Sequence, residues 1–446
     1  MRSRDFILAT LLILAPFGAA AADLVVWWEK GFYAQEDAAV REIVTAFEQE
    51  IGKRVELAFY AQRELGPEIQ STIEIGQPPD FAFGTLLGDY IGEWAFNDRL
   101  LDLTDPLGSL SELFDPNALA WWVLLNQKTG QRALYALPMG QYRQYIHVWK
   151  SLLEQAGFTL NDIPTGWEAF WSFWCDQVQP AVRRARGRGD IWGVGLSMSA
   201  DSVDTSNQFD RFIAAYEAEY VTPEGRLVVD NPKIRRNLIE AIDSYTAIYR
   251  KGCTPLDSVA WDATGNNEAF HAQAVVMTPN NTLSVVNALK HERPADYYEH
   301  TATVAWPLGA SGKAFPDGGG FFAAVVFKDS PNVETTKAFV RFLVAEGWLA
   351  HYLDFSGERM LPAMPKLLEA PFWLDPSDPH RMAAVMQASA RPLQHDYATV
   401  TGDWRYDSVM REEPWARAIH RIVSEGISPE QAVDETIARI KQVLSE

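Results

Sequence analysis

Cysteine is scarce in this sequence, and only Cys175 and Cys253 occur among its 446 residues. Neither belongs to a Cys-x-x-Cys pair, which excludes the spacing of a zinc ribbon or a thioredoxin-like redox site. In an oxidising compartment, an even number of cysteines without metal spacing permits a disulfide. We therefore predict one disulfide between the two cysteines, with a pair of buried free thiols as the alternative.

Motifs of the common enzyme classes are missing. The sequence has no Gly-x-Ser-x-Gly, His-Glu-x-x-His or Walker loop, and its eight histidines form no i, i+4 pair. The glycines of Gly193–Gly195 lack the third glycine of a dinucleotide fingerprint. Glycoside hydrolysis needs two acids, but nothing singles out two of the 59. We expect a protein without catalytic residues, metal or cofactor, with a secreted glycosidase or lyase as the less favoured reading.

Basic surface is also lacking. The sequence contains 39 Lys and Arg residues against 59 Asp and Glu residues, which gives a formal net charge of −20. The cluster at Arg183, Arg184, Arg186 and Arg188 is interrupted by a glycine and reads as a solvated loop. Nucleic-acid binding requires a basic face, so we expect no nucleic-acid partner.

Only the first residues of the chain form a long apolar run. Arg2 and Arg4 precede an apolar stretch over 6–17, and alanines occupy 19–22. This order is typical of a secretory signal cleaved after Ala22, and the apolar run is shorter than the roughly 20 residues that span a bilayer. No cysteine follows the cleavage point, so we expect a soluble monomer in the periplasm rather than a lipid-anchored protein.

What the sequence does contain is an alternation of short apolar runs and helical patterns. Residues 24–28, 54–60 and 80–83 have the character of strands. Between them, apolar residues recur at helical spacing, and Gly52 and Gly76 end the two helices. Such alternation predicts an α/β fold with a parallel sheet covered by helices.

Aromatic residues are abundant, with 16 Trp, 15 Tyr and 23 Phe. Sugars present apolar C–H faces and a rim of hydroxyl groups. Their sites therefore combine flat aromatic surfaces with Asp, Asn, Gln and Arg side chains. The aromatic and amide residues near predicted strand ends favour a carbohydrate ligand.

Several motifs, in order, resemble the extracellular solute-binding proteins of ABC importers, in the maltose-binding-like (family 1) carbohydrate cluster. The motifs are Leu-Val-Val-Trp (24–27), Phe-Glu-Gln-Glu-Ile-Gly-Lys-Arg-Val (47–55), Gly-Gln-Pro-Pro-Asp-Phe (76–81), Leu-Tyr-Ala-Leu-Pro-Met-Gly (134–140) and Asn-Asn-Glu-Ala-Phe-His-Ala-Gln-Ala-Val-Val-Met-Thr (266–278). The resemblance covers essentially the whole mature chain. It implies an ABC permease and its ATPase as partners.

The resemblance also implies a two-lobed periplasmic binding protein fold of type II, with a ligand cleft between hinged lobes. We expect the signal peptide at 1–22, an N-terminal lobe from 23–140 plus 301–356, and a C-terminal lobe from 141–300 plus 357–446. Hinges are expected near 140–143, 300–303 and 356–361.

Ligand-binding positions carried over from the family fall in loops after strands and in the crossing segments. They are Trp28, Glu29, Lys30, Phe32, Tyr33, Thr85, Asp89, Gln141, Tyr142, Gln208, Trp261, Asn280, Asn281, Gly319, Gly320, Phe321, Trp404 and Arg405. Asp210, close to Gln208, belongs to the same group. The simpler readings are that Phe32 and Tyr33 cover a helix, that Asn280–Asn281 is only a turn, and that the tryptophans pack.

One of these positions departs from the family. Many members have an acid where this chain has Tyr142, so a maltose-like hydroxyl pattern is not implied. We expect a mono- or disaccharide, a polyol or a related derivative. The alternative ligand is an anionic sugar derivative, such as a phosphate or sulfonate, or another organic anion, held by Lys30, Arg143 and Arg405.

Overall fold

The computed structural model of the chain describes residues 22–222, 224–345, 347–355, 359–390, 393 and 403–445. The expected signal peptide, apart from Ala22, lies outside the described residues, as does part of the expected third hinge. Among the described residues, none of the helices combines the length and apolar character needed to cross a membrane.

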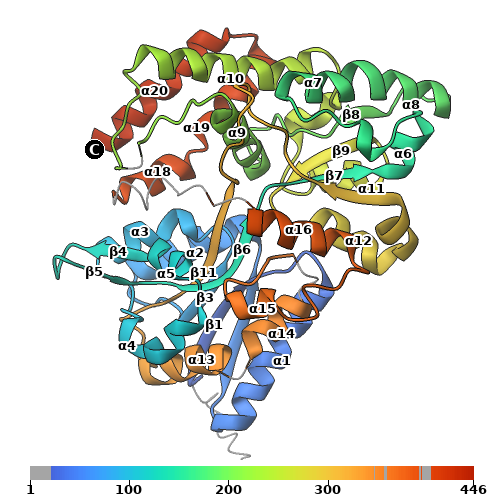
Figure 1. Cartoon of the computed structure of the whole chain (residues 1–446). Helices are drawn as coiled ribbons and strands as arrows, with labels where there is room; N and C mark the ends of the chain where they lie inside the picture. Colours follow the sequence, from blue (N-terminus) through green and yellow to red (C-terminus); the bar gives the residue numbers. More distant parts are fainter. Residues whose placement is uncertain are drawn as a thin grey trace, which may run out of the picture.

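Two sheets organise the chain, and each carries its own helices (Figure 1). The first has the strand order β2 (Val55–Tyr60), β1 (Leu24–Glu29), β3 (Phe81–Gly84), β11 (Gly319–Val326) and β6 (Leu137–Arg143). The second has the order β10 (Thr301–Val304), β7 (Tyr145–Trp149), β9 (Val275–Asn280) and β8 (Trp192–Val194). A hairpin joins β4 (Val123–Asn126) to β5 (Gln131–Leu134). We call the parts built on these sheets the first and the second lobe.

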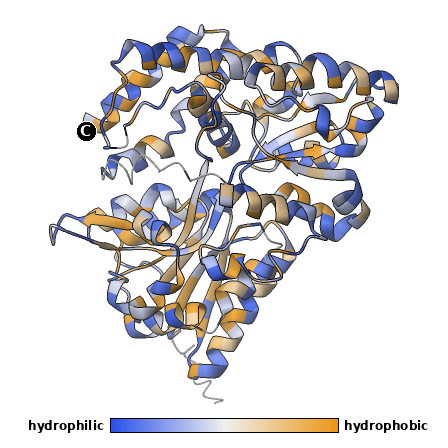
Figure 2. Cartoon of the chain, in the orientation of Figure 1, coloured by the Kyte–Doolittle hydropathy of each residue, from blue (hydrophilic) through white to orange (hydrophobic). Residues whose placement is uncertain are grey.

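The helices surround the two sheets. In chain order they are α1 (Ala34–Ile51), α2 (Gln62–Glu74), α3 (Gly88–Phe96), α4 (Thr104–Leu107), α5 (Pro116–Trp121), α6 (Lys150–Gln155), α7 (Trp167–Ser172), α8 (Gln179–Arg186), α9 (Val203–Ala215), α10 (Pro232–Arg250), α11 (Gly265–His271), α12 (Ser284–Glu292), α13 (Val333–Ala345), α14 (Trp348–Phe355), α15 (Pro365–Leu368), α16 (Pro379–Ala390), α18 (Arg405–Arg411), α19 (Pro414–Glu425) and α20 (Pro429–Ser445). Figure 2 shows apolar residues along the strands and polar residues on the outward side of many helices.

Local patterns explain the first βα units. Leu24, Val26 and Trp28 alternate into the core of β1, as expected for a strand with one face under a helix. Helix α1 ends where Gly52 adopts φ 65° and donates its N–H to the carbonyl of Glu48. Strands β2, β1 and β3 are parallel, as the alternation predicts.

The parallel arrangement predicted for β1, β2 and β3 does not extend across the whole first sheet. Strand β11 runs antiparallel to both β3 and β6, so the first sheet is mixed. The reason is non-local: β11 returns to the first lobe after the chain has built most of the second. Its partners are therefore set by the route of the chain and not by its own sequence.

The two lobes meet along crossing segments. Strand β6 leads through Gln144 directly into β7, and the Gln144 N–H donates to the carbonyl of Gly318 on the returning chain. Residues 301–304 form β10 and pair with β7 in the second sheet, although the predicted limits assign them to the N-terminal lobe. The lobe limits and the hinges themselves stay a prediction.

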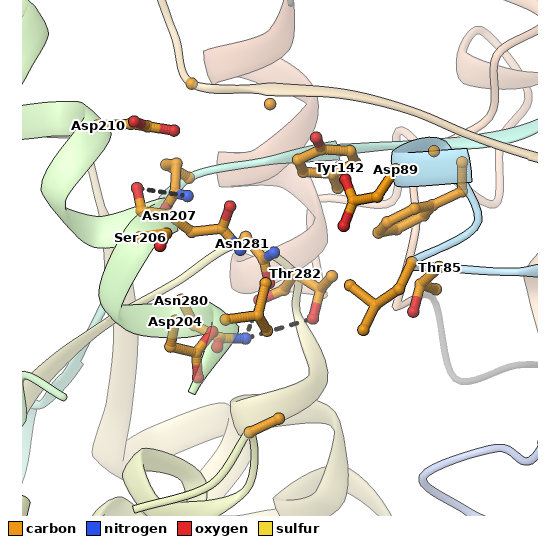
Figure 3. A pocket seen from close by; sticks show the side chains of 18 of the residues that line it. Thr85, Asp89, Tyr142, Asp204, Ser206, Asn207, Asp210, Asn280, Asn281 and Thr282 are labelled. Atoms are coloured by element: carbon orange, nitrogen blue, oxygen red, sulfur yellow. Dashed lines mark hydrogen bonds between the residues drawn. The ribbon is translucent and has the colours of Figure 1, made fainter. Parts of the chain in front are cut away.

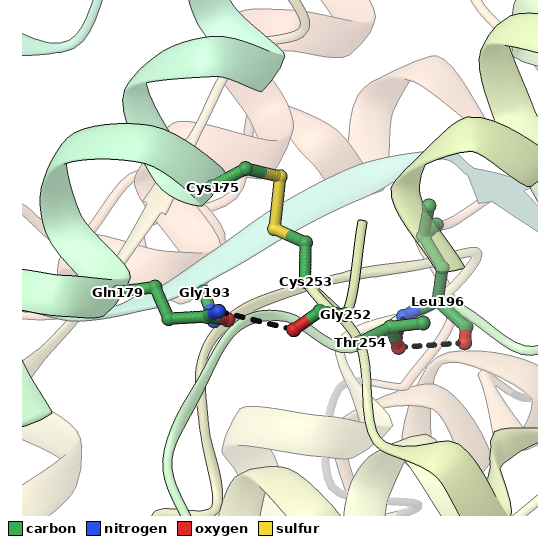
Figure 4. The surroundings of a disulfide bond; sticks show 7 residues. All are labelled: Cys175, Gln179, Gly193, Leu196, Gly252, Cys253 and Thr254. Carbon is green, nitrogen blue, oxygen red and sulfur yellow. Dashed lines mark hydrogen bonds between the residues drawn. A yellow bond between two sulfur atoms is a disulfide. The ribbon is translucent and has the colours of Figure 1, made fainter. Parts of the chain in front are cut away.

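The predicted disulfide is present (Figure 4). Cys175 lies in the π-helical segment Phe173–Val178 between α7 and α8, and Cys253 follows α10. Beside the bridge, the Gln179 side chain accepts the Gly193 N–H at 2.8 Å and donates to the Gly252 carbonyl at 3.0 Å. The bridge therefore joins the π-helical segment after α7 to the segment after α10.

Two buried histidines lie between the second sheet and α16. His147 of β7 and His380 of α16 share the hydroxyl of Thr303, at 3.0 and 2.7 Å. Burial lowers the pKa of His147 to about 3 and that of His380 to about 4. Both imidazoles are therefore neutral in the folded protein at pH 5, whereas an unfolded chain protonates them below about pH 6.5.

We expect His380→Gln to gain stability relative to the wild type as the pH falls. A folded-state pKa below the unfolded one makes a histidine reduce stability between about pH 6.5 and 4, by up to about 1.4 kcal/mol per pH unit. The variant lacks that loss. The difference between the two proteins isolates this effect, because acids with raised pKa values act in the opposite direction. Urea unfolding at pH 7, 6 and 5 measures it, and a pH-independent difference would contradict the assignment.

Candidate functional site

A pocket opens between the two lobes (Figure 3). Its first-lobe side includes Thr85 after β3, Asp89 of α3 and Tyr142 of β6. Figure 3 shows these side chains facing a second group from α9 and from the segment after β9. The pocket lies beyond the carboxyl ends of β1 and β3, where open α/β sheets commonly bind ligands.

Aromatic rings form much of the first-lobe wall. Tyr142 stacks on Phe322 with ring centroids 4.5 Å apart, and Trp121 meets Phe321 edge-on at 5.6 Å. These rings come from α5, β6 and β11, which pack side by side because β11 pairs with β6. Trp122 extends the same wall. The result is a set of apolar surfaces of the kind that pack against sugar C–H faces.

Glycine is required at one point of this wall. Gly319 has φ +147°, and a Cβ atom there would lie 2.1 Å from the Tyr142 carbonyl oxygen. Both the backbone conformation and the close approach exclude a larger side chain. Gly319 thus lets β11 pack closely beside the strand that carries Tyr142.

The second-lobe wall is polar. Asp204, Ser206, Asn207 and Asp210 line the pocket from the first half of α9. The other polar segment, 280–284, begins with the last residue of β9. Within it the Asn280 amide donates to the Thr282 carbonyl and the Ser284 hydroxyl, each at 3.0 Å. These bonds stabilise the turn, whose amide and hydroxyl side chains line the pocket.

A third wall comes from α18 and the start of α19. Asp407, Met410 and Glu413 line the pocket there. Helix α18 also bridges the lobes, because Arg411 donates to the Asp89 carbonyl at 2.5 Å and to the Glu93 carboxylate at 2.6 Å. Helix α18 thus packs both against α3 of the first lobe and against α20.

A buried ionic network lies under the first-lobe side. Glu29 accepts the Thr85 N–H at 2.6 Å, and Arg359 approaches Glu29 at 3.7 Å and Glu36 at 3.2 Å. The guanidinium also covers the Phe32 ring at 4.9 Å. Burial raises the pKa of Glu36 to about 7, although Arg359 opposes that rise. This network positions the loops after β1 and β3.

Several of the predicted ligand positions lie together in the pocket lining. They are Phe32, Thr85, Asp89, Tyr142, Asn280, Asn281, Gly319 and Phe321, and Asp210 lies with them. Contact of these residues with a ligand stays a prediction.

The other predicted positions lie outside the lining, where each contacts another part of the protein. Trp28 packs in the core against Phe83 and Tyr352, and Glu29 supports Thr85. Lys30 pairs with Asp37, and the Tyr33 hydroxyl donates to the Ser284 carbonyl across the lobes. The rest are Gln141 (bonded to the Pro362 carbonyl), Gln208 (bonded to the Pro279 carbonyl), Trp261 (packed on Gly265), Gly320 (under Trp121 and Tyr142), Trp404 (against Phe96) and Arg405 (paired with Asp403).

Sequence reasoning missed a number of lining residues. Among them are Trp121, Trp122, Asp204, Ser206, Asn207, Thr282, Arg359 and Glu413. The adjacent tryptophans at the end of a short helix were a usable signal, since both of their large apolar rings line the pocket. Asp204 and Glu413 offered no local signal, because their shared environment depends on how distant helices meet.

The chain is similar to a known protein family over most of its length. Residues 42–383 match the model of a family described as bacterial extracellular solute-binding proteins. No curated protein matches the chain.

Solved structures share the fold over nearly the whole chain. Maltose-bound MalE3 of T. maritima has a TM-score of 0.75 at 17% identity and covers 94% of this chain and 99% of its own. The GacH receptor of Streptomyces glaucescens, solved unliganded and with acarbose, has a TM-score of 0.74 at 17% identity. The match covers 95% of this chain and 98% of the receptor. A tagatose-bound solute-binding protein of Thermotoga lettingae has a TM-score of 0.72 at 16% identity. The match covers 94% of this chain and 99% of that protein. At such identities the likeness shows the two-lobed fold alone.

Proposed function

Because the chain belongs to the family of bacterial extracellular solute-binding proteins, we propose that it captures a small carbohydrate and delivers it to an ABC permease and its ATPase. The observation that carries the proposal is the pocket itself, where aromatic rings of the first lobe face amides, hydroxyls and carboxylates of the second. The ligand is a mono- or disaccharide, a polyol or a related derivative. Proteins of similar fold bind maltose and tagatose.

Capture would proceed by closure of the lobes about the crossing segments, which removes the ligand from water. The contacts of Tyr33 with Ser284 and of Arg411 with Glu93 join the lobes across the pocket and would belong to the closed state. The protein would act in the periplasm as a monomer after removal of its signal peptide. No catalytic step is proposed.

A neutral ligand fits this pocket better than an anionic one. The three cations that the anionic alternative requires lie outside the lining, and each is paired with an acid: Lys30 with Asp37, Arg143 with Asp317, and Arg405 with Asp403. The described lining contains five acids and two cations, and one cation, Arg359, already contacts two buried carboxylates. An anion would meet net negative charge.

A thermal-shift screen of the mature protein tests the proposal. The probes are maltose, tagatose, glucose, cellobiose and sorbitol, with glucose 6-phosphate and a sulfonated glucose as anions. We expect a neutral sugar to raise the midpoint, since a ligand at a hundredfold excess over its Kd stabilises by about 2.7 kcal/mol. A shift with the anions alone would reject the neutral ligand, and turnover of a bound sugar would reject a purely binding role.

We expect Tyr142→Ala to weaken binding of the sugar that gives the largest shift by about tenfold or more, because it removes a half-buried ring from the pocket wall. The matched variant Tyr142→Phe keeps the ring and drops only the hydroxyl, so its affinity should fall less than about threefold. Titration calorimetry measures both. Equal losses in the two variants would assign the contact to the hydroxyl rather than the ring.

A further inference from the structure

Two carboxylates line the pocket where its second-lobe wall adjoins the third wall. Asp204 stands in the first turn of α9, and Glu413 precedes α19. The Ser206 hydroxyl donates to Glu413, which brings the start of α9 against the start of α19. Because Ser206 and Glu413 are 207 positions apart in the sequence, only the folded chain forms this acid pair.

Asp204 is the unusual member. It is only 4% exposed, and its Oδ2 atom accepts no hydrogen bond from any described residue. A buried carboxylate oxygen without a donor is costly, and native structures rarely leave one without a reason. Since Asp204 lines the pocket, a bound molecule can supply the missing donor.

The electrostatic environment of Asp204 and Glu413 favours a positively charged donor. Burial and the neighbouring Glu413 raise the pKa of Asp204 to about 7, and burial likewise raises the pKa of Glu413. Arg63 of α2 opposes both shifts and Arg417 of α19 opposes that of Glu413, but both of these cations are exposed. The unliganded pair therefore holds negative charge with poor compensation. A sugar hydroxyl would satisfy the oxygen without neutralising the pair.

We propose that Asp204 and Glu413 form a subsite for a protonated amine on the ligand, so that the carbohydrate is an amino sugar or another basic sugar derivative. This inference rests on the proposed function and narrows its ligand class. An ammonium group donates up to three hydrogen bonds and carries the charge that the pair lacks. A metal ion fits less well, because the described residues hold no group of three or more acids, histidines or cysteines placed to bind one.

The test compares amino sugars with their hydroxyl counterparts at pH 7. Glucosamine, galactosamine, mannosamine and the β-1,4-linked glucosamine disaccharide are each paired with the neutral parent sugar. N-acetylglucosamine adds bulk at the same carbon without the charge. Thermal shift ranks the probes, and calorimetry gives their affinities. We expect at least one amine to bind about tenfold or more tightly than its neutral parent.

Variants locate the effect. Asp204→Asn keeps the shape and removes the charge, so the preference for the amine over its neutral parent sugar should fall about tenfold or more. Asp201→Asn is the matched control, since Asp201 is exposed close to α9 and outside the lining. Glu413→Gln provides a second test of the same pair should Asp204→Asn fail to fold.

The outcomes separate the two proposals. Amine preference that is lost in Asp204→Asn and kept in Asp201→Asn supports the subsite. Neutral sugars that bind as tightly as the amines overturn the subsite and leave the carbohydrate-binding role standing. Amine preference that survives in both acid-pair variants also overturns it. No binding by any sugar, neutral or basic, overturns both proposals.

Discussion

Replacing Arg359 with methionine is expected to lower the free energy of unfolding by about 3–5 kcal/mol at pH 8. Arg359 is 4% exposed and contacts Glu29 and Glu36, which are 3% and 2% exposed. Its removal leaves two buried carboxylates without their cation. Such uncompensated charges cost far more than the loss of an exposed ion pair. Urea unfolding of the wild type and the variant measures the difference.

Glu36→Gln supplies the control for this prediction. The pKa of Glu36 is already raised to about 7 by burial, so the single variant should differ little from the wild type near neutral pH. The double variant Arg359→Met/Glu36→Gln should recover part of the stability, because only Glu29 then stays charged, and Thr85 still donates to it. A loss below about 1 kcal/mol in Arg359→Met would contradict a buried network.

The largest single change to the second lobe would come from removing its disulfide. Serine at both Cys175 and Cys253 should lower the free energy of unfolding by roughly 4 kcal/mol, the chain-entropy value for a closed loop of 78 residues. The mechanism is the greater freedom of the unfolded chain once the loop is open. Gln179 still links Gly193 to Gly252, so we expect the lobe to fold without the bridge.

Reduction of the wild type provides an independent check on that value. A thiol reductant should destabilise the wild type by a similar amount and leave the double-serine variant unchanged. If reduction destabilised both proteins equally, the bridge would not be the cause. If the double-serine variant were as stable as the oxidised wild type, the unfolded chain would already be compact in this loop.

Both experiments address features that differ in how far sequence alone could predict them. The disulfide could be predicted from the number of cysteines, because two cysteines without metal spacing allow one pairing. The Arg359 network did not, because Arg359 is more than 320 positions from its acids and no periodicity links them. Charged residues in a sequence carry no sign of which will be buried together.

The sequence by itself determined the local elements. Apolar spacing and Gly52 placed α1, and the short apolar runs placed β1, β2 and β3, because a helix or strand depends on neighbours a few residues away. It also indicated, through a resemblance, a family to which the chain belongs. The loops after β1 and β3 were expected near the ligand, and Phe32 and Thr85 do line the pocket.

Tertiary structure alone decided which side chains share the pocket. Alternation along β1 could not say whether Trp28 would face the pocket or the core, and Tyr352 of α14 packs against its buried face. Lys30 pairs with Asp37 of α1 and lies outside the pocket lining. Asp204 and Glu413 meet only because α9 packs against α19. The environment of a side chain is set by long-range packing, and a single sequence encodes that packing without displaying it.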